Sequence, residues 1–237
     1  MGNQKFYVQE YSRLNPEWRN SVVIYRNIVR ELTTPETYIL DIGCGHIDNM
    51  KSVFDKTPHV YGVDPDQSAL DKNTLIKNKK VGVVEELPFE SNFFDLVVLQ
   101  WVLEHLDNPE KAFQEIYRVL KPGGKVVFLT PNIWNYTIFI IRLIPNRLHG
   151  LMNRKFYGKP EEDTYPTRYR INSVKKIAKT LEPMGFKKSQ IIFNGDPYYL
   201  SINRPLFALA CFIEKILDLK PFKSGKIYLI GEYEKTG

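Results

Sequence analysis

The sequence has little or none of several features that would define its class. Its 237 residues include two cysteines, Cys44 and Cys211, too few for a disulfide framework or a zinc site. No apolar run reaches the roughly 18 residues that a membrane-spanning helix needs, because Arg142 and Pro145 interrupt the best stretch. The N-terminal residues lack the apolar core of a signal peptide. We therefore expect a soluble, cytoplasmic chain that forms a single domain over residues 1–237 and holds no metal.

Acidic residues are scarce in the second part of the chain. Residues 1–130 contain 15 Lys and Arg against 18 Asp and Glu, whereas residues 131–237 contain 18 against 9. The net charge of +6 therefore conceals a basic second half, which favours an anionic substrate, an acidic membrane surface or nucleic acid. A solvated basic face explains the same pattern without any partner.

Short apolar runs alternate with helical stretches along most of the chain. An apolar stripe at helical spacing predicts a helix over residues 15–33, with Asn15 as its cap and Pro16 in its first turn. Nearly continuous apolar strands joined by helices predict a parallel sheet covered on both faces, with the ligand crevice at the carboxyl ends of the strands. The predicted strands are residues 38–42, 60–63, 81–84, 94–99, 125–130, 189–194 and 226–233.

Two later segments depart from this alternation. Residues 131–172 are aromatic, basic and irregular, and an insertion of this length predicts a functional role on the substrate side of the crevice. Residues 205–219 form a helical pattern that is apolar around most of its circumference. A core helix, a dimer face and a peripheral contact with the inner face of a membrane all remain open for it.

A glycine turn and an acidic residue give the strongest chemical pattern. Gly43 and Gly45 directly follow the first predicted strand, where residues without Cβ allow a tight turn and a close approach to a ligand. Asp64 ends the second predicted strand about 20 residues later, a position where a carboxylate binds ribose hydroxyls. Asp64 or Asp66 could instead cap the helix that follows.

Six short motifs, each weak by itself, occur in one order and spacing from about residue 38 to residue 132. They resemble those of class I S-adenosylmethionine-dependent methyltransferases, in the small-molecule branch often called type 11. The resemblance implies a Rossmann-like sheet of seven strands, mostly parallel with an antiparallel last strand and helices on both faces. It disfavours a nicotinamide enzyme, because the third glycine of that fingerprint is missing. The motifs are Leu40-Asp41-Ile42-Gly43-Cys44-Gly45, Gly62-Val63-Asp64, Glu86-Leu87-Pro88-Phe89-Glu90, Phe93-Phe94-Asp95-Leu96-Val97, Leu103-Glu104-His105 and Arg118-Val119-Leu120-Lys121-Pro122-Gly123-Gly124.

The resemblance also assigns a set of residues to the cofactor, S-adenosyl-L-methionine. Two positions depart from the family pattern. Ile47 replaces a further glycine, and Val83 stands where an Asp commonly holds the adenine amino group, so that backbone groups or Glu85 would hold adenine here. The predicted cofactor residues are Asp41, Gly43, Cys44, Gly45, Asp64, Pro65, Val84, Glu85 and Gln100.

The acceptor is predicted to be a small molecule, a sugar or a lipid-linked compound, with oxygen as the accepting atom. A hydroxyl acceptor needs a base, for which His105, His149 and Asp163 are candidates, although a structural tie is the alternative role for His105. Two other classes stay open: a non-catalytic relative, because of Ile47 and Val83, and a nucleic-acid methyltransferase, which is disfavoured because no Asn/Asp-Pro-Pro-Tyr tetrapeptide occurs. The predicted acceptor-binding residues are Trp134, Tyr165, Arg168 and Arg170.

Overall fold

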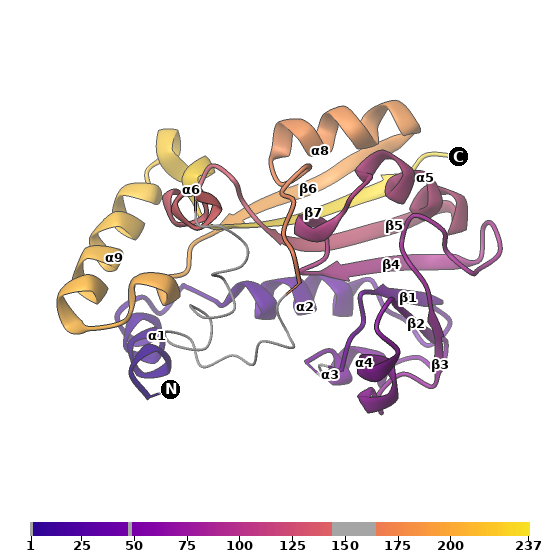
Figure 1. The fold of residues 1–237 in the computed structure, drawn as a ribbon, viewed down its shortest axis with the longest axis horizontal. Coiled ribbons are helices and arrows are strands. Elements are labelled where there is room, and N and C mark those ends of the chain that lie inside the picture. The colour runs from indigo at the N-terminus through magenta and orange to yellow at the C-terminus, as the bar shows by residue number, and fades with distance from the viewer. Residues whose placement is uncertain (1, 47–48, 144–164) are drawn as a thin grey trace.

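A computed structural model describes residues 2–46, 49–143 and 165–237 of the chain. Within these residues the centre is a seven-stranded sheet with the strand order β3-β2-β1-β4-β5-β7-β6 (Figure 1). Strands β1 to β5 run parallel, and β7 runs antiparallel to both of its neighbours, β5 and β6. The predicted Rossmann-like sheet, mostly parallel with an antiparallel last strand, is confirmed.

Strands β1, β2, β4, β5 and β7 are largely buried, as their nearly continuous apolar sequences predicted, whereas most residues of β3 and the middle of β6 are exposed or half-buried. In β1, Leu40 and Ile42 belong to one hydrophobic cluster, whereas Ile39 belongs to the cluster on the opposite face. This alternation follows from the two-residue period of a strand. The strands are β1 (Ile39–Ile42), β2 (Val60–Asp64), β3 (Asn78–Val81), β4 (Phe94–Gln100), β5 (Leu120–Pro131), β6 (Phe186–Asn194) and β7 (Tyr228–Lys235).

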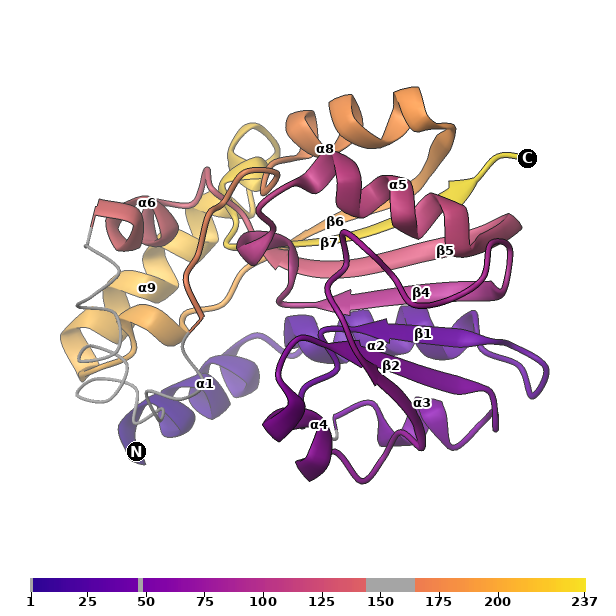
Figure 2. The same ribbon diagram turned by 45° about the vertical axis from the view of Figure 1, so that its right-hand side comes forward.

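Helices form a layer on each face of the sheet (Figures 1 and 2). Buried residues of α5 and α8 belong to the cluster of Leu40, and those of α2, α3 and α4 to the cluster of Ile39. The helices are α1 (Gly2–Leu14), α2 (Ser21–Glu31), α3 (Lys51–Phe54), α4 (Gln67–Lys72), α5 (Pro109–Val119), α6 (Tyr136–Leu143), α8 (Val174–Leu181) and α9 (Arg204–Leu217). Short 3₁₀ turns are η1 (Leu103–His105), η4 (Glu182–Met184), η5 (Tyr198–Leu200) and η6 (Lys220–Gly225).

The carboxyl ends of the parallel strands share one edge of the sheet. β2 and β4 lie on opposite sides of β1, so the chain leaves this edge in two directions and a crevice opens there. In both views β4 and β5 point toward the end of the molecule where α1, α6 and α9 gather (Figures 1 and 2). The crevice and these three helices therefore lie at the same end of the sheet.

The N-terminal region corrects the helix predicted over residues 15–33. Residues 2–14 form α1, which the sequence analysis did not predict, and α2 begins only at Ser21, where the Asn20 side chain accepts a hydrogen bond from the Val22 N–H. Trp18 lies between the helices, and its indole N–H donates to the Gly195 carbonyl oxygen at 2.8 Å. That long-range contact, which local periodicity cannot reveal, holds the connection out of the helix.

The third strand also lies earlier than predicted. β3 covers Asn78–Val81, whereas the prediction was residues 81–84. Val83 and Glu86 pair as an isolated antiparallel bridge, which turns the chain back after the strand. The run Val81-Gly82-Val83-Val84 is apolar in sequence, yet Val81 and Val83 are exposed on the outer strand and its turn. Apolar composition alone therefore placed the strand a few residues too late.

Candidate functional site

The turn after β1 requires its glycines for two different reasons. Gly43 and Gly45 have φ values of +68° and +42°, in the left-handed region that glycine adopts without strain. A Cβ on Gly43 would lie 2.5 Å from Cγ2 of Val102, whereas a Cβ on Gly45 would meet no atom of the described residues within 4 Å. Gly43 is thus required for close packing, and Gly45 leaves open space beside the turn.

The Asp64 carboxylate faces this turn from the end of β2. Its Oδ2 accepts a hydrogen bond from the Gly45 N–H at 2.9 Å, and its Oδ1 accepts one from the Asp66 N–H at 2.9 Å. A carboxylate offers about four lone-pair sites, so about two remain for hydroxyl groups of a ligand. The cap of α4 is a different residue, Asp66, whose side chain accepts from the Ser68 and Ala69 N–H groups.

A cavity opens between this turn and the end of β4. It combines residues from α2, β1, the glycine turn and the end of β4, which are separated in sequence and joined by the sheet order. Of the predicted cofactor residues, five line it, together with four further residues. The lining residues are Tyr25, Asp41, Gly43, Cys44, Gly45, Asn49, Met50, Gln100 and Trp101.

Two polar side chains of this cavity, those of Asp41 and Tyr25, lack enough interaction partners among the described residues. Burial, reinforced by the nearby charge of Asp64, raises the pKa of Asp41 to about 8. The Tyr25 hydroxyl is fully buried and has no hydrogen-bond partner among the described residues. Since a buried polar group without a partner costs about 1–3 kcal/mol, a polar and cationic ligand would stabilise both groups.

Cys44 and Trp101 shape the cavity. Cys44 is buried, and its Sγ would lie 2.8 Å from a Cβ added to Gly62, so it packs directly on β2. Burial also raises the pKa of the Cys44 thiol, which suits packing rather than nucleophilic chemistry. Trp101 has a φ of +60°, unusual for a bulky residue, and its ring packs edge-on against Tyr228 at 4.8 Å.

The remaining predicted cofactor residues lie on the neighbouring loops. Pro65 is exposed directly after Asp64, and Val84 is buried. Glu85 is half-buried, and its Oε1 accepts a hydrogen bond from the Asn108 N–H at 3.3 Å. With Val83 nearly half exposed, this loop presents no Asp side chain at the position where the family pattern has one.

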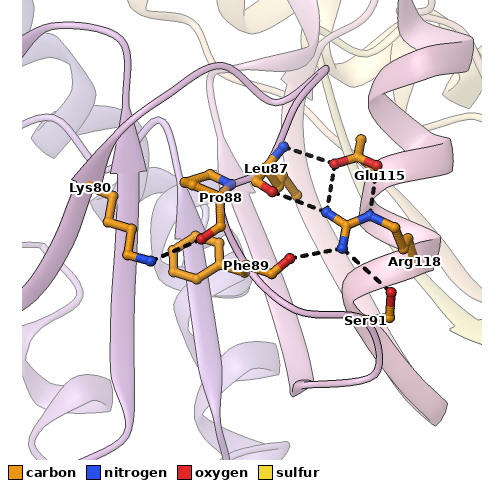
Figure 3. Close-up of polar contacts among 7 residues, drawn as sticks. All are labelled: Lys80, Leu87, Pro88, Phe89, Ser91, Glu115 and Arg118. Carbon is orange, nitrogen blue, oxygen red and sulfur yellow. Dashed lines mark hydrogen bonds and ion pairs between the residues drawn. The ribbon is translucent and has the colours of Figure 1, made fainter.

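Two of the motifs that carry the resemblance meet in space to hold that loop (Figure 3). The Arg118 guanidinium donates to the carbonyl oxygens of Leu87 at 3.0 Å and Phe89 at 2.8 Å. It also pairs with Glu115, whose carboxylate accepts from the Leu87 N–H at 2.9 Å. The Lys80 ammonium donates to the Pro88 carbonyl oxygen from the other side. These residues fix the backbone beside the site and do not enter the cavity.

Residues 165–170 cross from η1 toward α4. The Tyr165 hydroxyl donates to Asp66 Oδ2 at 3.1 Å, and the Glu104 carbonyl oxygen accepts from the Arg168 and Tyr169 N–H groups. His105 Nδ1 lies 2.9 Å from the Pro166 carbonyl oxygen. The segment is therefore tied to both sides of the crevice.

The two arginines of this crossing segment have partners within the protein. Arg168 Nε donates to Asp107 Oδ1 at 2.8 Å, and Arg170 donates to the Asp107 carbonyl oxygen at 2.5 Å. Both guanidinium groups are about half exposed. Their predicted role in binding an anionic acceptor stays a prediction, and the structure adds a second role in holding the segment.

The segment after β5 contains two buried asparagines that hold it in place and one exposed tryptophan. Asn132 and Asn135 are buried, and their amides donate to the carbonyl oxygens of Ser224, Lys226 and Gly225. Trp134, between them, is 73% exposed. Its predicted place in the acceptor site remains a prediction, because Trp134 is absent from the lining of the cavity described above.

Two neighbouring carboxyl groups lie near α9: Glu214 is buried and Asp196 is half-buried, and the sequence analysis did not select either. Glu214 of α9 is 2% exposed, and one of its oxygens is buried without a hydrogen-bond partner in the described part of the chain. This oxygen packs so closely on Gly195 that any Cβ there would overlap it. Burial raises the pKa of Glu214 to about 7 and that of Asp196 to about 6.

Two predicted catalytic residues, His149 and Asp163, lie outside the described residues, as do Ile47 and Asp48. The residues that the sequence analysis missed, Tyr25, Glu214 and Asp196, share one property. Each becomes notable only through its surroundings in the fold: the Tyr25 hydroxyl and one Glu214 oxygen are buried without a partner among the described residues, and burial raises the pKa of Glu214 and of Asp196. No local motif signals that condition.

The sheet order, the glycine turn and the carboxylate that faces it define the class I methyltransferase fold, and comparisons with known proteins agree. Residues 40–128 match a family model described as a methyltransferase domain. An uncharacterized methyltransferase of Schizosaccharomyces pombe is 39% identical over 104 residues, 37% of each chain. The ubiquinone biosynthesis O-methyltransferase of Coxiella burnetii is 27% identical over 137 residues, 52% of this chain and 58% of that protein.

Among solved structures, the geranyl diphosphate C-methyltransferase of Streptomyces coelicolor is similar with a TM-score of 0.60 and 16% identity. The match covers 98% of this chain and 83% of that one. The chain spans 37% and 58% of the lengths of the two curated relatives. Residues 40–128 thus match a methyltransferase-domain model, and the chain shares the fold of that solved structure.

Proposed function

We propose that this chain transfers a methyl group from S-adenosyl-L-methionine to an oxygen of a small-molecule, sugar or lipid-linked acceptor. The observation that carries the proposal is the Asp64 carboxylate, which faces the Gly43–Gly45 turn with lone pairs to spare. That arrangement suits the ribose of an adenosyl group. The cytoplasm and the inner face of a membrane are the proposed locations.

The residues of the cavity fit this cofactor. When bound, S-adenosylmethionine supplies an activated methyl group on a sulfonium. Asp64 would accept hydrogen bonds from the ribose hydroxyls, and the open space beside Gly45 admits a ligand close to the backbone. Gln100 and Trp101 line the same cavity at the end of β4, where they would orient the methionine portion.

Asp41 favours a cationic ligand. Its raised pKa means that the ionised form is disfavoured in the protein alone. A positively charged group in the cavity would stabilise the carboxylate and release the proton. Both the sulfonium and the ammonium of S-adenosylmethionine offer such a charge, so the chemistry of the site agrees with that of the cofactor.

The proposal for the acceptor rests on the names of similar proteins and on the residues available as a base. The Coxiella relative is named as an O-methyltransferase, and the Streptomyces structure as a C-methyltransferase. An oxygen acceptor requires removal of a proton. His105 is one proposed base: if Nδ1 donates to the Pro166 carbonyl oxygen, Nε2 keeps a lone pair that can accept a proton. His149 and Asp163 remain proposed alternatives.

Isothermal titration calorimetry with S-adenosylmethionine tests the proposal. Removing the charge in Asp64→Asn should lower affinity about ten- to a hundredfold, because a hydrogen bond to a charged group contributes about 1.5–3 kcal/mol. Asp71→Asn, in the exposed part of α4, is the matched control and should bind as the unmodified protein does. No binding by the unmodified protein would favour the non-catalytic alternative, for which Val83 is the motivating observation.

Methyl transfer itself is tested with radiolabelled cofactor and a panel of nucleotide sugars, lipid-linked glycans, quinone precursors and small acids. We expect label to enter an oxygen-bearing acceptor in a reaction that requires Asp64. Label recovered on carbon would overturn the choice of oxygen and keep the methyltransferase.

A further inference from the structure

Helix α9 keeps part of its surface exposed among the described residues. Phe207, Ala210 and Glu214 form its buried face. On another face Leu209, Phe212 and Ile216 are 47%, 61% and 36% exposed, and their spacing of three and four residues makes them one stripe. The possibility of a core helix, left open by the sequence, is therefore excluded for this stripe.

The stripe continues onto neighbouring elements. Leu219 and Phe222, which follow α9, are 56% and 51% exposed. Phe6 of α1 is 58% exposed, and the adjacent Tyr7 stacks on Phe207 of α9 with ring centroids 4.9 Å apart, which joins the two helices.

Helix α6 adds Phe139 and Ile140, both more than half exposed, and Trp134 precedes it. Both ribbon views place α1, α6 and α9 at the same end of the molecule (Figures 1 and 2). We call this surface the apolar end and define it by Phe6, Trp134, Phe139, Leu209, Phe212 and Phe222.

Large exposed hydrophobic side chains are concentrated there. Among the described residues, those outside α1, α6, α9 and their adjoining turns are Val81, Val83 and Tyr165. Single exposed hydrophobic residues are ordinary, but a contiguous group marks an interaction site. The concentration at one end therefore calls for a partner.

Lysines border the apolar end. Lys215, Lys220 and Lys223 are exposed on α9 and η6, and none of them forms an ion pair within the described part of the chain. The acidic residues of this segment are occupied: Glu214 is buried, and Asp218 pairs with Lys226. Aromatic and aliphatic side chains flanked by unpaired lysines match an anionic lipid surface. A second copy of this chain would bring lysines against lysines.

No helix of the described residues is long and apolar enough to cross a bilayer. We propose that the apolar end docks on the surface of a bilayer that carries anionic headgroups, with Phe212 and Leu209 inserted at the interface and the lysines at the headgroups. This orientation turns the carboxyl edge of the sheet, where Gln100 and Trp101 line the cavity, toward the lipid. Docking itself does not depend on methyl transfer; delivery of a membrane acceptor rests on the proposed function.

Vesicle flotation tests docking with the full chain and no cofactor. The unmodified protein should float with vesicles of phosphatidylcholine mixed with phosphatidylglycerol, and more weakly with phosphatidylcholine alone. The double variant Leu209→Ser/Phe212→Ser should lose at least about tenfold in binding, because apolar burial at the interface drives it. Lys220→Gln and Lys223→Gln should each reduce binding to the anionic vesicles about fivefold, since each lysine near such a surface contributes about 1 kcal/mol.

Two controls separate docking from loss of fold and from the proposed function. Val81→Ser removes an equally exposed apolar side chain outside the apolar end and should leave vesicle binding unchanged. Thermal unfolding and cofactor titration of the Leu209/Phe212 variant should match the unmodified protein, so a failure of cofactor binding is recognised independently of docking. The proposal is overturned if the protein stays unbound to anionic vesicles at low salt. It is equally overturned if the serine substitutions convert a dimer into a monomer and leave vesicle binding intact.

Discussion

The cavity beside the glycine turn and the region around α9 differ in which groups they leave without partners. On the cofactor side, the glycine turn, Asp41 and Tyr25 surround an open cavity, so a ligand can reach each polar group that the protein leaves without enough partners. Around α9, on the proposed acceptor side, Glu214 is sealed against Gly195, while large apolar side chains are exposed. Polar groups without enough partners therefore face the cavity at one end, and exposed apolar side chains face solvent at the other.

This difference teaches where each half of the function is encoded. The cofactor side depends on backbone geometry, which a few residues at fixed spacing specify and which the family model recognises over residues 40–128. The proposed acceptor side depends on which helix faces are left exposed, and it lies largely beyond that range. Substitutions whose effects on stability and on ligand binding are measured separately can test this difference.

The largest expected effect concerns the two glycines of the turn. Gly43→Ala should destabilise the protein by about 2–4 kcal/mol, because it combines a left-handed φ with a clash against Val102. Gly45→Ala should cost only about 1–2 kcal/mol in stability, yet lower cofactor affinity at least about tenfold by filling the open space beside the turn. Urea unfolding and calorimetry measure the two quantities.

Gly123→Ala is the matched control for that experiment. Gly123 has a φ of +76° and no described atom within 4 Å of an added Cβ, so its backbone strain resembles that of Gly45 without lining the cavity. Its stability cost should be similar and its cofactor affinity unchanged. Equal losses of affinity at Gly45 and Gly123 would show that strain, rather than contact with a ligand, explains the result.

The sheet could be predicted from sequence because it depends on local signals that agree with one another. Apolar runs placed the strands other than β3 close to their observed positions, and Asn108 and Asp66 are the capping residues at the starts of α5 and α4. The start of α2 could not be predicted, because Trp18 is held by a contact with Gly195, 177 positions away in sequence. Asn15 and Pro16 have the right chemistry for a helix start, but that contact prevails over them.

The residues of the candidate site also separate into those that sequence spacing reveals and those that only the packing reveals. The turn and Asp64 were found because sequence spacing reports directly on backbone geometry there. Tyr25 looked like one member of an apolar stripe in α2, and only the packing shows that its buried hydroxyl lacks a partner. Arg168 and Arg170 looked like anion-binding groups, because Asp107, which pairs with them, comes some 60 residues earlier in sequence.

A smaller effect is expected from pH, and it separates the two buried acids. Asp41 and Glu214 have pKa values raised to about 8 and about 7. Between its ordinary pKa and the raised one, each group is protonated in the folded state and ionised when unfolded. Stability contributed by each therefore falls as pH rises through that window, by at most about 1.4 kcal/mol per pH unit. Asp41→Asn and Glu214→Gln should each flatten part of this dependence in urea unfolding between pH 5 and pH 8.

The pH dependence of cofactor affinity should distinguish Asp41 from Glu214. Because a cationic ligand prefers the ionised Asp41, affinity should rise with pH by up to about tenfold per unit and level off near pH 8. Asp41→Asn should abolish the rise, whereas Glu214→Gln should keep it, since Glu214 is sealed away from the cavity. A cofactor affinity independent of pH between 6 and 8 in the unmodified protein would contradict the proposed role of Asp41.

The smallest effect is expected where the crossing segment is tied to Asp107. Arg168 and Asp107 are 41% and 68% exposed, so their ion pair should contribute less than about 1 kcal/mol to stability. A double-mutant cycle of Arg168→Ala and Asp107→Ala, followed by thermal unfolding, measures that coupling. If Arg168 only holds the segment, Asp107→Ala should change KM for an anionic acceptor as much as Arg168→Ala does. If Arg168 binds the acceptor directly, the arginine variant alone should raise KM, because Asp107→Ala leaves the guanidinium charge in place. That outcome would make the acceptor side rely, as the cofactor side does, on a polar group directed toward its ligand.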